Sequence, residues 1–396
     1  MPPVAGVGLG AAASGVRYRG RDDLLFVKLA PGTSVAGVFT RSRTASAPVA
    51  WCRQALSGGR ARGLVANAGN ANAFTGAAGD AAVGRTAEAA ARLIDCRPCE
   101  VFIASTGVIG EPLSDRRITQ ALPVLYRCLG PDRWEAAAGA IMTTDTFPKG
   151  ATRQATLGRA TVTINGIAKG SGMIAPDMAT MLAFLFTDAA IPASVLQTLL
   201  ARAVERSFNA ITVDGDTSTS DTVLLFATGQ GPRHPPVRRP GEARLKPYRE
   251  ALEAVCRDLA HQIVRDGEGA QRFVTITVTG AASKRAARRI GLTVANSPLV
   301  KTAIAGSDPN WGRVVAAVGN AGEKVDPRRL TIRIGGVLVA ADGAVHPDYT
   351  EAAAAAHMRG RDIAIDVDVG VGRGRGVVWT CDLTHRYIDI NADYRS

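Results

Sequence analysis

Aromatic residues and cysteines are scarce in this 396-residue chain. Aromatic residues make up 5% of it, which disfavours a protein that stacks nucleic-acid bases. Its six cysteines are spread along the sequence, so they form no disulfide framework and reduced thiols are expected. Cys96 and Cys99 have the spacing of half a zinc or redox site, but no second CxxC and no HxxxH completes it. We therefore interpret this pair as part of a surface turn.

Long apolar runs and a cationic leader are also missing. No stretch approaches 18 apolar residues, which argues against a membrane span. The first 15 residues are small and apolar, with neither a basic segment nor a leucine-rich one, so a secretory signal is not expected. We expect a cytoplasmic protein that has no membrane partner.

Motifs for nucleotide binding and for histidine-based catalysis are absent. The glycine runs at 6–10, 170–172 and 370–376 lack the GxxxxGK[ST] pattern and the context of a dinucleotide fingerprint. The five histidines are scattered, without HExxH, and no GxSxG occurs. A nucleophile in this chain would therefore need a base other than histidine.

Positive charge is in excess. Lys and Arg number 47 against 35 Asp and Glu, which gives a formal net charge of +12. The densest basic segments, 232–249 and 283–289, contain little or no aromatic sequence, and we interpret them as solvated loops. A nucleic-acid partner is the less favoured alternative, and we expect none. The positive field would instead attract acidic small molecules such as glutamate.

Hydrophobic periodicity predicts an α+β protein with two domains. A change in composition near Gly280 places a main domain at 1–280 and a smaller α+β domain at 281–396. Strands are expected within 23–40 and at 63–67, 100–104, 160–168, 180–186, 223–227 and 273–278. Helices are expected at 78–94, 118–128, 134–142, 192–207 and 248–264.

The segment from Lys169 to Thr180 is the most unusual part of the sequence. A polar, glycine-containing loop, KGSGMIAPDMA, ends at Thr180, and the apolar run MLAFLF follows at once. Thr180 could simply begin a buried strand. It could also be a nucleophile: after cleavage before Thr180, its free α-amino group, of pKa about 7.7 to 8.0, could accept the proton of its own hydroxyl. Such an enzyme needs oxyanion donors, and the turn Ser105-Thr106-Gly107 is a candidate.

Several ordered blocks of the sequence resemble the ornithine acetyltransferases, also described as bifunctional glutamate N-acetyltransferases. The segment 169–184 is one of them. The others are GVFT at 37–40, ANAGNAN at 66–72, ASTGVIG at 104–110, MTTDTFPK at 142–149, FN at 208–209, TVDGDTST at 212–219, DGEGA at 266–270, NSPLVKT at 296–302 and SDPNWGR at 307–313. The chain departs from the family at Asp177, Ser220 and Ser396, where Asn, Asn and Thr are usual.

The resemblance implies a fold and a reaction. The fold is an N-terminal-nucleophile-type layered sandwich, with sheets between helices. Self-cleavage between Ala179 and Thr180 would give an α chain, 1–179, and a β chain, 180–396, which stay associated as α2β2. Thr180 would take acetyl from N-acetyl-L-ornithine and pass it to L-glutamate in a ping-pong cycle. Acetyl-CoA is a further candidate donor that the resemblance leaves open. No metal or organic cofactor is implied.

The resemblance also implies residue roles. Thr106 and Gly107 correspond to the oxyanion-hole pair, in agreement with the turn argument above. The residues that correspond to substrate contacts, besides Thr180 itself, are Thr146, Lys169, Glu268, Asn391 and Ser396. Lys169 suits a substrate carboxylate and Glu268 a substrate amine. An N-terminal-nucleophile amidase or aminopeptidase remains the alternative, because water could also accept the acyl group.

Overall fold

The computed structural model of the protein describes residues 1–175 and 181–392. The chain divides into two compact units. The first comprises residues 1–209 and 216–263, and the second comprises residues 210–215 and 264–396. The predictions that concern Ala179, Thr180 and Ser396 lie outside the described residues.

Two β-sheets form the middle of the first unit. One sheet has the order β1-β2-β4-β5, in which β4 and β5 are parallel. The other has the order β3-β9-β8-β7-β6, in which β8 and β9 are parallel. The strands of these sheets are β1 (Val7–Ala12), β2 (Leu24–Leu29), β3 (Ser34–Phe39), β4 (Gly63–Asn70), β5 (Val101–Val108), β6 (Lys149–Leu157), β7 (Ala160–Lys169), β8 (Leu182–Thr187) and β9 (Thr222–Ala227).

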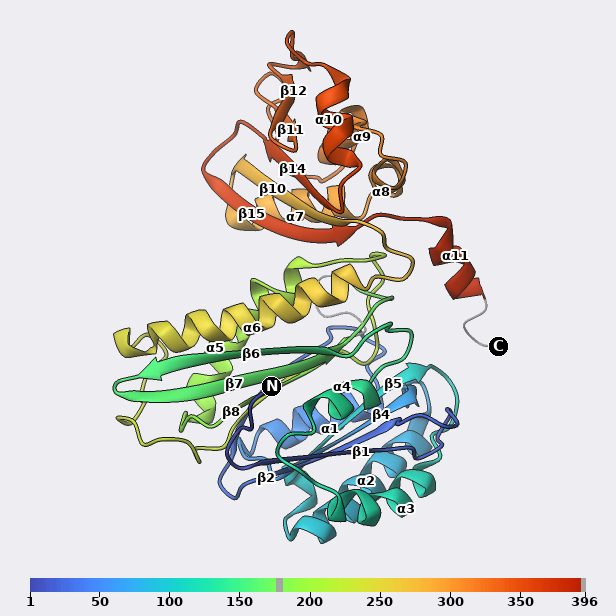
Figure 1. Cartoon of the computed structure of the whole chain (residues 1–396), viewed down its shortest axis with the longest axis vertical. Helices are drawn as coiled ribbons and strands as arrows, with labels where there is room; N and C mark the ends of the chain where they lie inside the picture. Colours follow the sequence, from blue (N-terminus) through green and yellow to red (C-terminus); the bar gives the residue numbers. More distant parts are fainter. Residues whose placement is uncertain (176–180, 393–396) are drawn as a thin grey trace. The chain divides into compact units, whose positions relative to one another are not determined.

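The two sheets pack face to face, with helices on their outer faces (Figure 1). Phe102 of β5 contacts Phe226 of β9 edge to face, with 5.9 Å between ring centroids. α2 and α3 cover the outer face of the first sheet, and α5 and α6 cover that of the second. The helices of this unit are α1 (Ala47–Leu56), α2 (Gly76–Ile94), α3 (Asp115–Arg127), α4 (Trp134–Ala140), α5 (Ala193–Glu205) and α6 (Lys246–Arg265). The expected layered α+β sandwich is confirmed.

The strands β8 and β9 show why the sequence predicts burial here. Every residue of both strands is buried, because one face meets the other sheet and the opposite face meets helices. A strand that is covered on both faces is apolar along its whole length rather than at alternate positions. β8 begins at Leu182, immediately after the segment that contains Thr180.

The second unit has one mixed sheet of order β13-β12-β11-β14-β10-β15, packed against helices. Its strands are β10 (Phe273–Ala281), β11 (Thr331–Ile334), β12 (Val337–Ala341), β13 (Ala344–Val345), β14 (Asp362–Asp368) and β15 (Gly374–Cys381). Its helices are α7 (Lys284–Ala295), α8 (Pro298–Ala305), α9 (Trp311–Gly319), α10 (Glu351–Met358) and α11 (His385–Ala392). The boundary at residue 280 stays a prediction. In the structure β10, which precedes that residue, pairs with β14 and β15 of this unit.

One predicted loop is wrong. The basic segment 283–289 belongs to a helix, because the Ser283 hydroxyl accepts the Ala286 N–H and begins α7.

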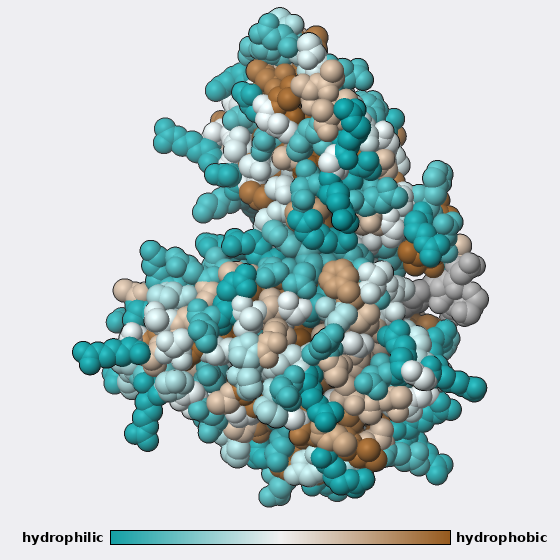
Figure 2. All heavy atoms as spheres, in the orientation of Figure 1, coloured by the Kyte–Doolittle hydropathy of each residue, from teal (hydrophilic) through white to brown (hydrophobic). Residues whose placement is uncertain are grey.

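Hydrophilic side chains predominate on the face shown in Figure 2, and hydrophobic ones form small patches. Over the described ranges, no helix combines the length and the apolar character needed to cross a bilayer.

Candidate active site

Thr106 and Gly107 lie at the end of β5, against the end of β4. Thr106 is buried, with 1% of its surface exposed. Gly107 has φ of +132°, and a Cβ at this position would lie 2.2 Å from the carbonyl carbon of Gly69. The register between β4 and β5 shifts at Gly69 and Asn70 to allow this approach. Glycine is therefore required at 107. The predicted turn at 105–107 is wrong, because these residues lie within β5, whose pairing with β4 continues past Gly107.

Lys169 is the last residue of β7, and its ammonium group reaches Thr106. Lys169 Nζ donates a hydrogen bond to Thr106 Oγ1 over 3.2 Å, and both side chains are buried. The two residues come from the two facing sheets and stand 63 positions apart in the sequence. The structure thus brings together two of the residues that the sequence singled out.

A buried ion pair lies next to Lys169. Lys149 Nζ is 2.7 Å from Asp145 Oδ1, and neither side chain is exposed. The backbone N–H of Gly170, the residue after Lys169, donates to the same oxygen over 2.6 Å. Burial alone would raise the pKa of Asp145, but the charges of Lys169 and Lys149, together with these hydrogen bonds, lower it to about 2. Asp145 is therefore ionised at neutral pH.

Asp221 lies at the other side of this region, just before β9. Its Oδ1 accepts the N–H of Met181 over 2.8 Å, and the residue is fully buried. Burial raises the pKa of Asp221 well above its ordinary value, against the opposing effects of the Met181 N–H and the charge of Lys169. Two carboxyl groups near Lys169 thus have opposite shifts, Asp145 downward and Asp221 upward.

Thr146 lies on the same loop as Asp145. Thr146 is exposed, whereas Asp145 beside it is buried. The hydroxyls of Thr144 and Ser171 lie 2.7 Å apart and join this loop to the segment after β7. The predicted contact Thr146 is therefore at the surface of the loop that carries the buried ion pair.

Glu268 and Asn391 belong to the second unit and contact each other. Asn391 Nδ2 donates to Glu268 Oε2 over 2.7 Å. Two further hydrogen bonds hold α11 to neighbouring loops: Thr384 Oγ1 donates to the carbonyl of Gly269 over 2.7 Å, and Tyr387 donates to Asp214 over 3.3 Å. Asp214 lies in the short segment that this unit takes from the middle of the chain.

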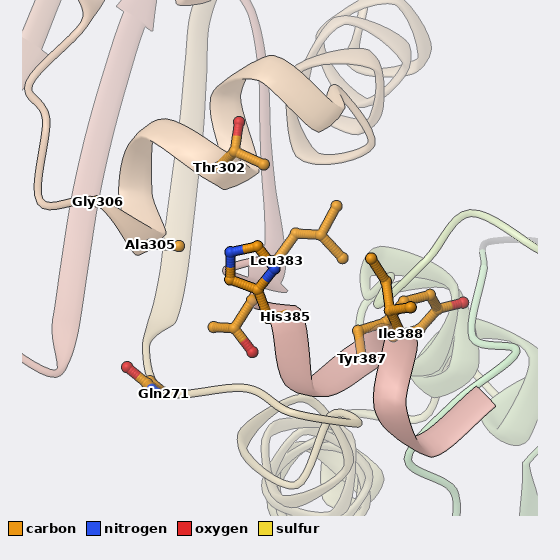
Figure 3. Close-up of a pocket in the computed structure, with 9 residues that line it drawn as sticks. Gln271, Thr302, Ala305, Gly306, Leu383, His385, Tyr387 and Ile388 are labelled. Atoms are coloured by element: carbon orange, nitrogen blue, oxygen red, sulfur yellow. The ribbon is translucent and has the colours of Figure 1, made fainter. Parts of the chain in front are cut away.

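A cavity of about 720 Å³ lies within the second unit, beside α11 (Figure 3). Leu383 and His385 lie between α8 and α11 in this view. The cavity is lined by Gln271, Thr302, Ala305, Gly306, Leu383, Thr384, His385, Tyr387 and Ile388. Of the predicted substrate contacts that the structure describes, Thr146, Lys169, Glu268 and Asn391, none lines it.

Cys96 and Cys99 lie in a turn, as the sequence indicates. Cys99 belongs to a short 3-10 helix, Pro98–Glu100, and is exposed, and both thiols are free. Burial raises the pKa of Cys96 to about 11, so this thiol is protonated at neutral pH.

Asp145, Lys149 and Asp221 are not among the site residues that the sequence predicts. Asp145 and Lys149 stand within the block MTTDTFPK, and their spacing of four residues was the available signal. That signal is weak, because such pairs are common on solvated surfaces. Only the structure shows that both groups are buried. Asp221 had no signal of its own, since its carboxylate accepts the N–H of Met181, which lies 40 residues earlier in the chain.

Comparison with known proteins gives matches along the whole chain. The model of the ArgJ family matches residues 8–396. The arginine biosynthesis bifunctional protein ArgJ of Bradyrhizobium diazoefficiens is 55% identical over all of this chain and 96% of its own length. ArgJ of Gluconobacter oxydans is also 55% identical, over all of this chain and 93% of its own. The crystal structure of ArgJ from Bacillus halodurans aligns with a TM-score of 0.51 and 38% identity, covering 53% of this chain and 97% of that chain.

Proposed function

The chain belongs to the ArgJ family, and from this premise we propose that it moves an acetyl group from N-acetyl-L-ornithine to L-glutamate through an acetyl ester on Thr180. The products are L-ornithine and N-acetyl-L-glutamate. Full-length relatives with 55% identity are arginine biosynthesis proteins, which supports an acyltransferase of that pathway.

One observation carries the assignment of the site. The Lys169–Thr106 contact lies at the end of β7, where Lys169 pairs in register with Leu182 of β8. Leu182 is the second residue after Thr180 in the sequence. Lys169 therefore connects the candidate oxyanion donor to the strand that follows the candidate nucleophile in the chain, and this supports the proposal of one site.

The proposed chemistry needs no histidine. The Thr180 hydroxyl attacks the acetyl carbonyl carbon, and the α-amino group of Thr180 accepts the hydroxyl proton. The hydroxyl of Thr106 and the N–H of Gly107 donate to the oxyanion of the tetrahedral intermediate. The ornithine amine leaves with the proton, and the amine of glutamate then attacks the acetyl ester in a second, matching step.

The free α-amino group requires self-cleavage between Ala179 and Thr180. One property of the Bacillus halodurans relative supports two polypeptides: its crystallised chain aligns over 97% of its length yet covers only 53% of this chain, so it is about half as long. We propose an α chain, 1–179, and a β chain, 180–396, assembled as α2β2. We also propose that the enzyme acts in the cytoplasm.

The remaining predicted residues are proposed as substrate contacts. Lys169 and Glu268 have the charges that pair with the carboxylate and amine groups of amino acids. Thr146, Asn391 and Ser396 supply polar contacts. The relatives are named bifunctional, and this supports a second activity, for which we propose acetyl-CoA as the donor to glutamate. Activity with acetyl-CoA and glutamate alone would test that donor.

Denaturing intact mass of the wild type and of Thr180→Ala tests the nucleophile. The expected result is two fragments that meet at Ala179/Thr180 in the wild type and a single 41.2 kDa chain in the variant. An uncut wild type would remove the proposal. The cut enzyme is then given N-acetylornithine with and without glutamate. Transfer with little hydrolysis supports the acetyltransferase, whereas release of free acetate at the same rate without glutamate would indicate an amidase.

A further inference from the structure

The hydroxyl of Thr106 can both donate and accept hydrogen bonds. It has one hydrogen to donate and two lone pairs with which to accept. One lone pair is used by Lys169 Nζ, 3.2 Å away, and Lys169 is the partner of this hydroxyl within the described residues. The Lys169 ammonium can only donate, so the hydroxyl must accept and its own hydrogen stays available for another acceptor.

The hydrogen bond from the Lys169 ammonium group strengthens the Thr106 hydroxyl as a donor. A hydroxyl that accepts a hydrogen bond becomes a stronger donor, and the effect is larger where water is excluded. Both residues are almost fully buried, with 1% of Thr106 and 2% of Lys169 exposed. The positive charge of Lys169 is also only one hydrogen bond away from the Thr106 oxygen. It would therefore stabilise the negative charge of an oxyanion that accepts the Thr106 hydrogen.

The surroundings hold Lys169 in this position. The Gly170 N–H, in the peptide unit that follows Lys169, donates to Asp145 Oδ1, and Asp145 is itself bound to Lys149. The second carboxylate oxygen of Asp145 accepts the Thr143 N–H over 2.9 Å. A buried carboxylate with this many partners fixes the end of β7, and with it the direction in which Lys169 extends.

We propose that Lys169 is a positioning residue for the oxyanion donor, acting on the reaction through the Thr106 hydroxyl rather than only as a contact for a substrate carboxylate. The inference rests on the proposed function and deepens it. It has a direct consequence: Lys169 matters equally for an acyl donor that carries no carboxylate.

The two roles are separated by p-nitrophenyl acetate, an acetyl donor without a carboxylate. In the reaction the bond from acetyl to nitrophenolate breaks, the ester to Thr180 Oγ forms, and the hydroxyl proton passes to the α-amino group. The rates kcat/KM for p-nitrophenyl acetate and for N-acetylornithine are measured on wild type, Lys169→Met, Thr106→Val and the double variant. Intact mass and thermal unfolding are recorded for each.

We expect Lys169→Met to lower kcat/KM by roughly 10- to 100-fold for both donors. Adding Lys169→Met to Thr106→Val should cause little further loss of kcat/KM, because both changes disable the same oxyanion donor. Self-cleavage involves no substrate, so a folded Lys169→Met chain that is cut slowly supports the proposal as well. A cut variant that keeps the full ester rate and loses only the N-acetylornithine rate would overturn it.

Two further variants keep the test decisive. Lys169→Gln retains an N–H donor for Thr106 without the charge and serves if Lys169→Met does not fold. Lys169→Gln should lower kcat/KM for both donors by a similar factor, and by less than Lys169→Met does. A full ester rate together with loss of the N-acetylornithine rate would contradict the proposal. Lys301→Met is the matched control, because Lys301 is also buried and donates to a threonine, Thr380, over 2.9 Å. A wild type that is uncut and unreactive toward both donors would instead remove the proposed function.

Discussion

Asn391 donates a hydrogen bond to Glu268, with 2.7 Å between Nδ2 and Oε2. One residue lies in α11 and the other in the loop before β10. The contact engages one oxygen of the Glu268 carboxylate and fixes the orientation of the other. Two residues that the resemblance gives as separate substrate contacts therefore depend on each other.

Asn391→Ala tests this dependence. Without the amide, Glu268 loses the partner that orients it, so KM for N-acetylornithine and glutamate should rise about 10- to 150-fold, which corresponds to a lost hydrogen bond to a charged group. Steady-state kinetics measure the change, and intact mass should show unchanged cleavage. Asp389→Ala is the control, because Asp389 lies on the same helix in an exposed pair with Arg386. Equal KM values in the two variants would contradict the prediction.

Gly107→Ala should destabilise the protein and remove its activity. The new Cβ meets the backbone of Gly69 at a φ that side chains rarely adopt, so we expect a loss of more than about 2 kcal/mol in the free energy of unfolding. Gly110→Ala is the matched control: Gly110 also has positive φ, +84°, but nothing lies within 4 Å of its Cβ position. Urea unfolding of both variants checks the difference. Similar losses would mean that backbone conformation, and not the contact with Gly69, limits this position.

Lys149→Met should be strongly destabilising. Removal of one partner from a buried ion pair leaves the other charge uncompensated, which costs about 3–5 kcal/mol. The exposed pair of Arg153 and Asp258 provides the comparison, and Asp258→Asn should cost about 1 kcal/mol or less. Urea unfolding at pH 7 measures both. A small effect of Lys149→Met would show that Asp145 is adequately held by Lys169 and the backbone.

The pKa of Asp145 predicts a loss of stability in acid. Its folded pKa of about 2 is below its ordinary value of about 3.9, so the folded state binds this proton more weakly than the unfolded state. The contribution is complete above about pH 4 and is lost as the pH falls toward 2. Asp145→Asn should flatten the unfolding free energy between pH 4 and 2.5, measured by urea titration. An unchanged slope would place the acid sensitivity in other carboxylates.

Asp221 should have the opposite dependence. Its pKa is raised, so the folded state binds this proton more tightly, and the contribution is complete below about pH 4 and lost as the pH rises through the folded pKa. As the pH rises from 5 to 8, the double variant Thr180→Ala/Asp221→Asn should lose less of its unfolding free energy than the single variant Thr180→Ala. The reason is that asparagine resembles the neutral acid and can still accept the Met181 N–H. Urea unfolding across this range is the measurement. Parallel curves for the two proteins would show that Asp221 does not titrate there.

Local features of the sequence were sufficient for much of the fold. The uninterrupted apolar runs at β8 and β9 follow from the burial of both faces of these strands. The helical spacing of apolar residues in α2 and α6 follows from the burial of one face of each helix. The helix α7 was missed because its first turn is basic, and charge concealed the apolar face behind it. The strand β1 was missed because its glycines and alanines give little hydrophobic signal.

The sequence alone determined the candidate site as separate pieces: the Thr106-Gly107 pair, the Lys169 loop and the threonine at its end. Each is recognisable because its residue types and order are local properties, although the turn expected at Thr106-Gly107 is part of a strand. Only the tertiary structure decided which pieces meet. The packing of two sheets brings Lys169 to Thr106, buries Asp145 with Lys149 and places Asp221 against the start of β8. Burial and contact between distant segments set the charge state of each group, and a linear pattern of residues carries neither.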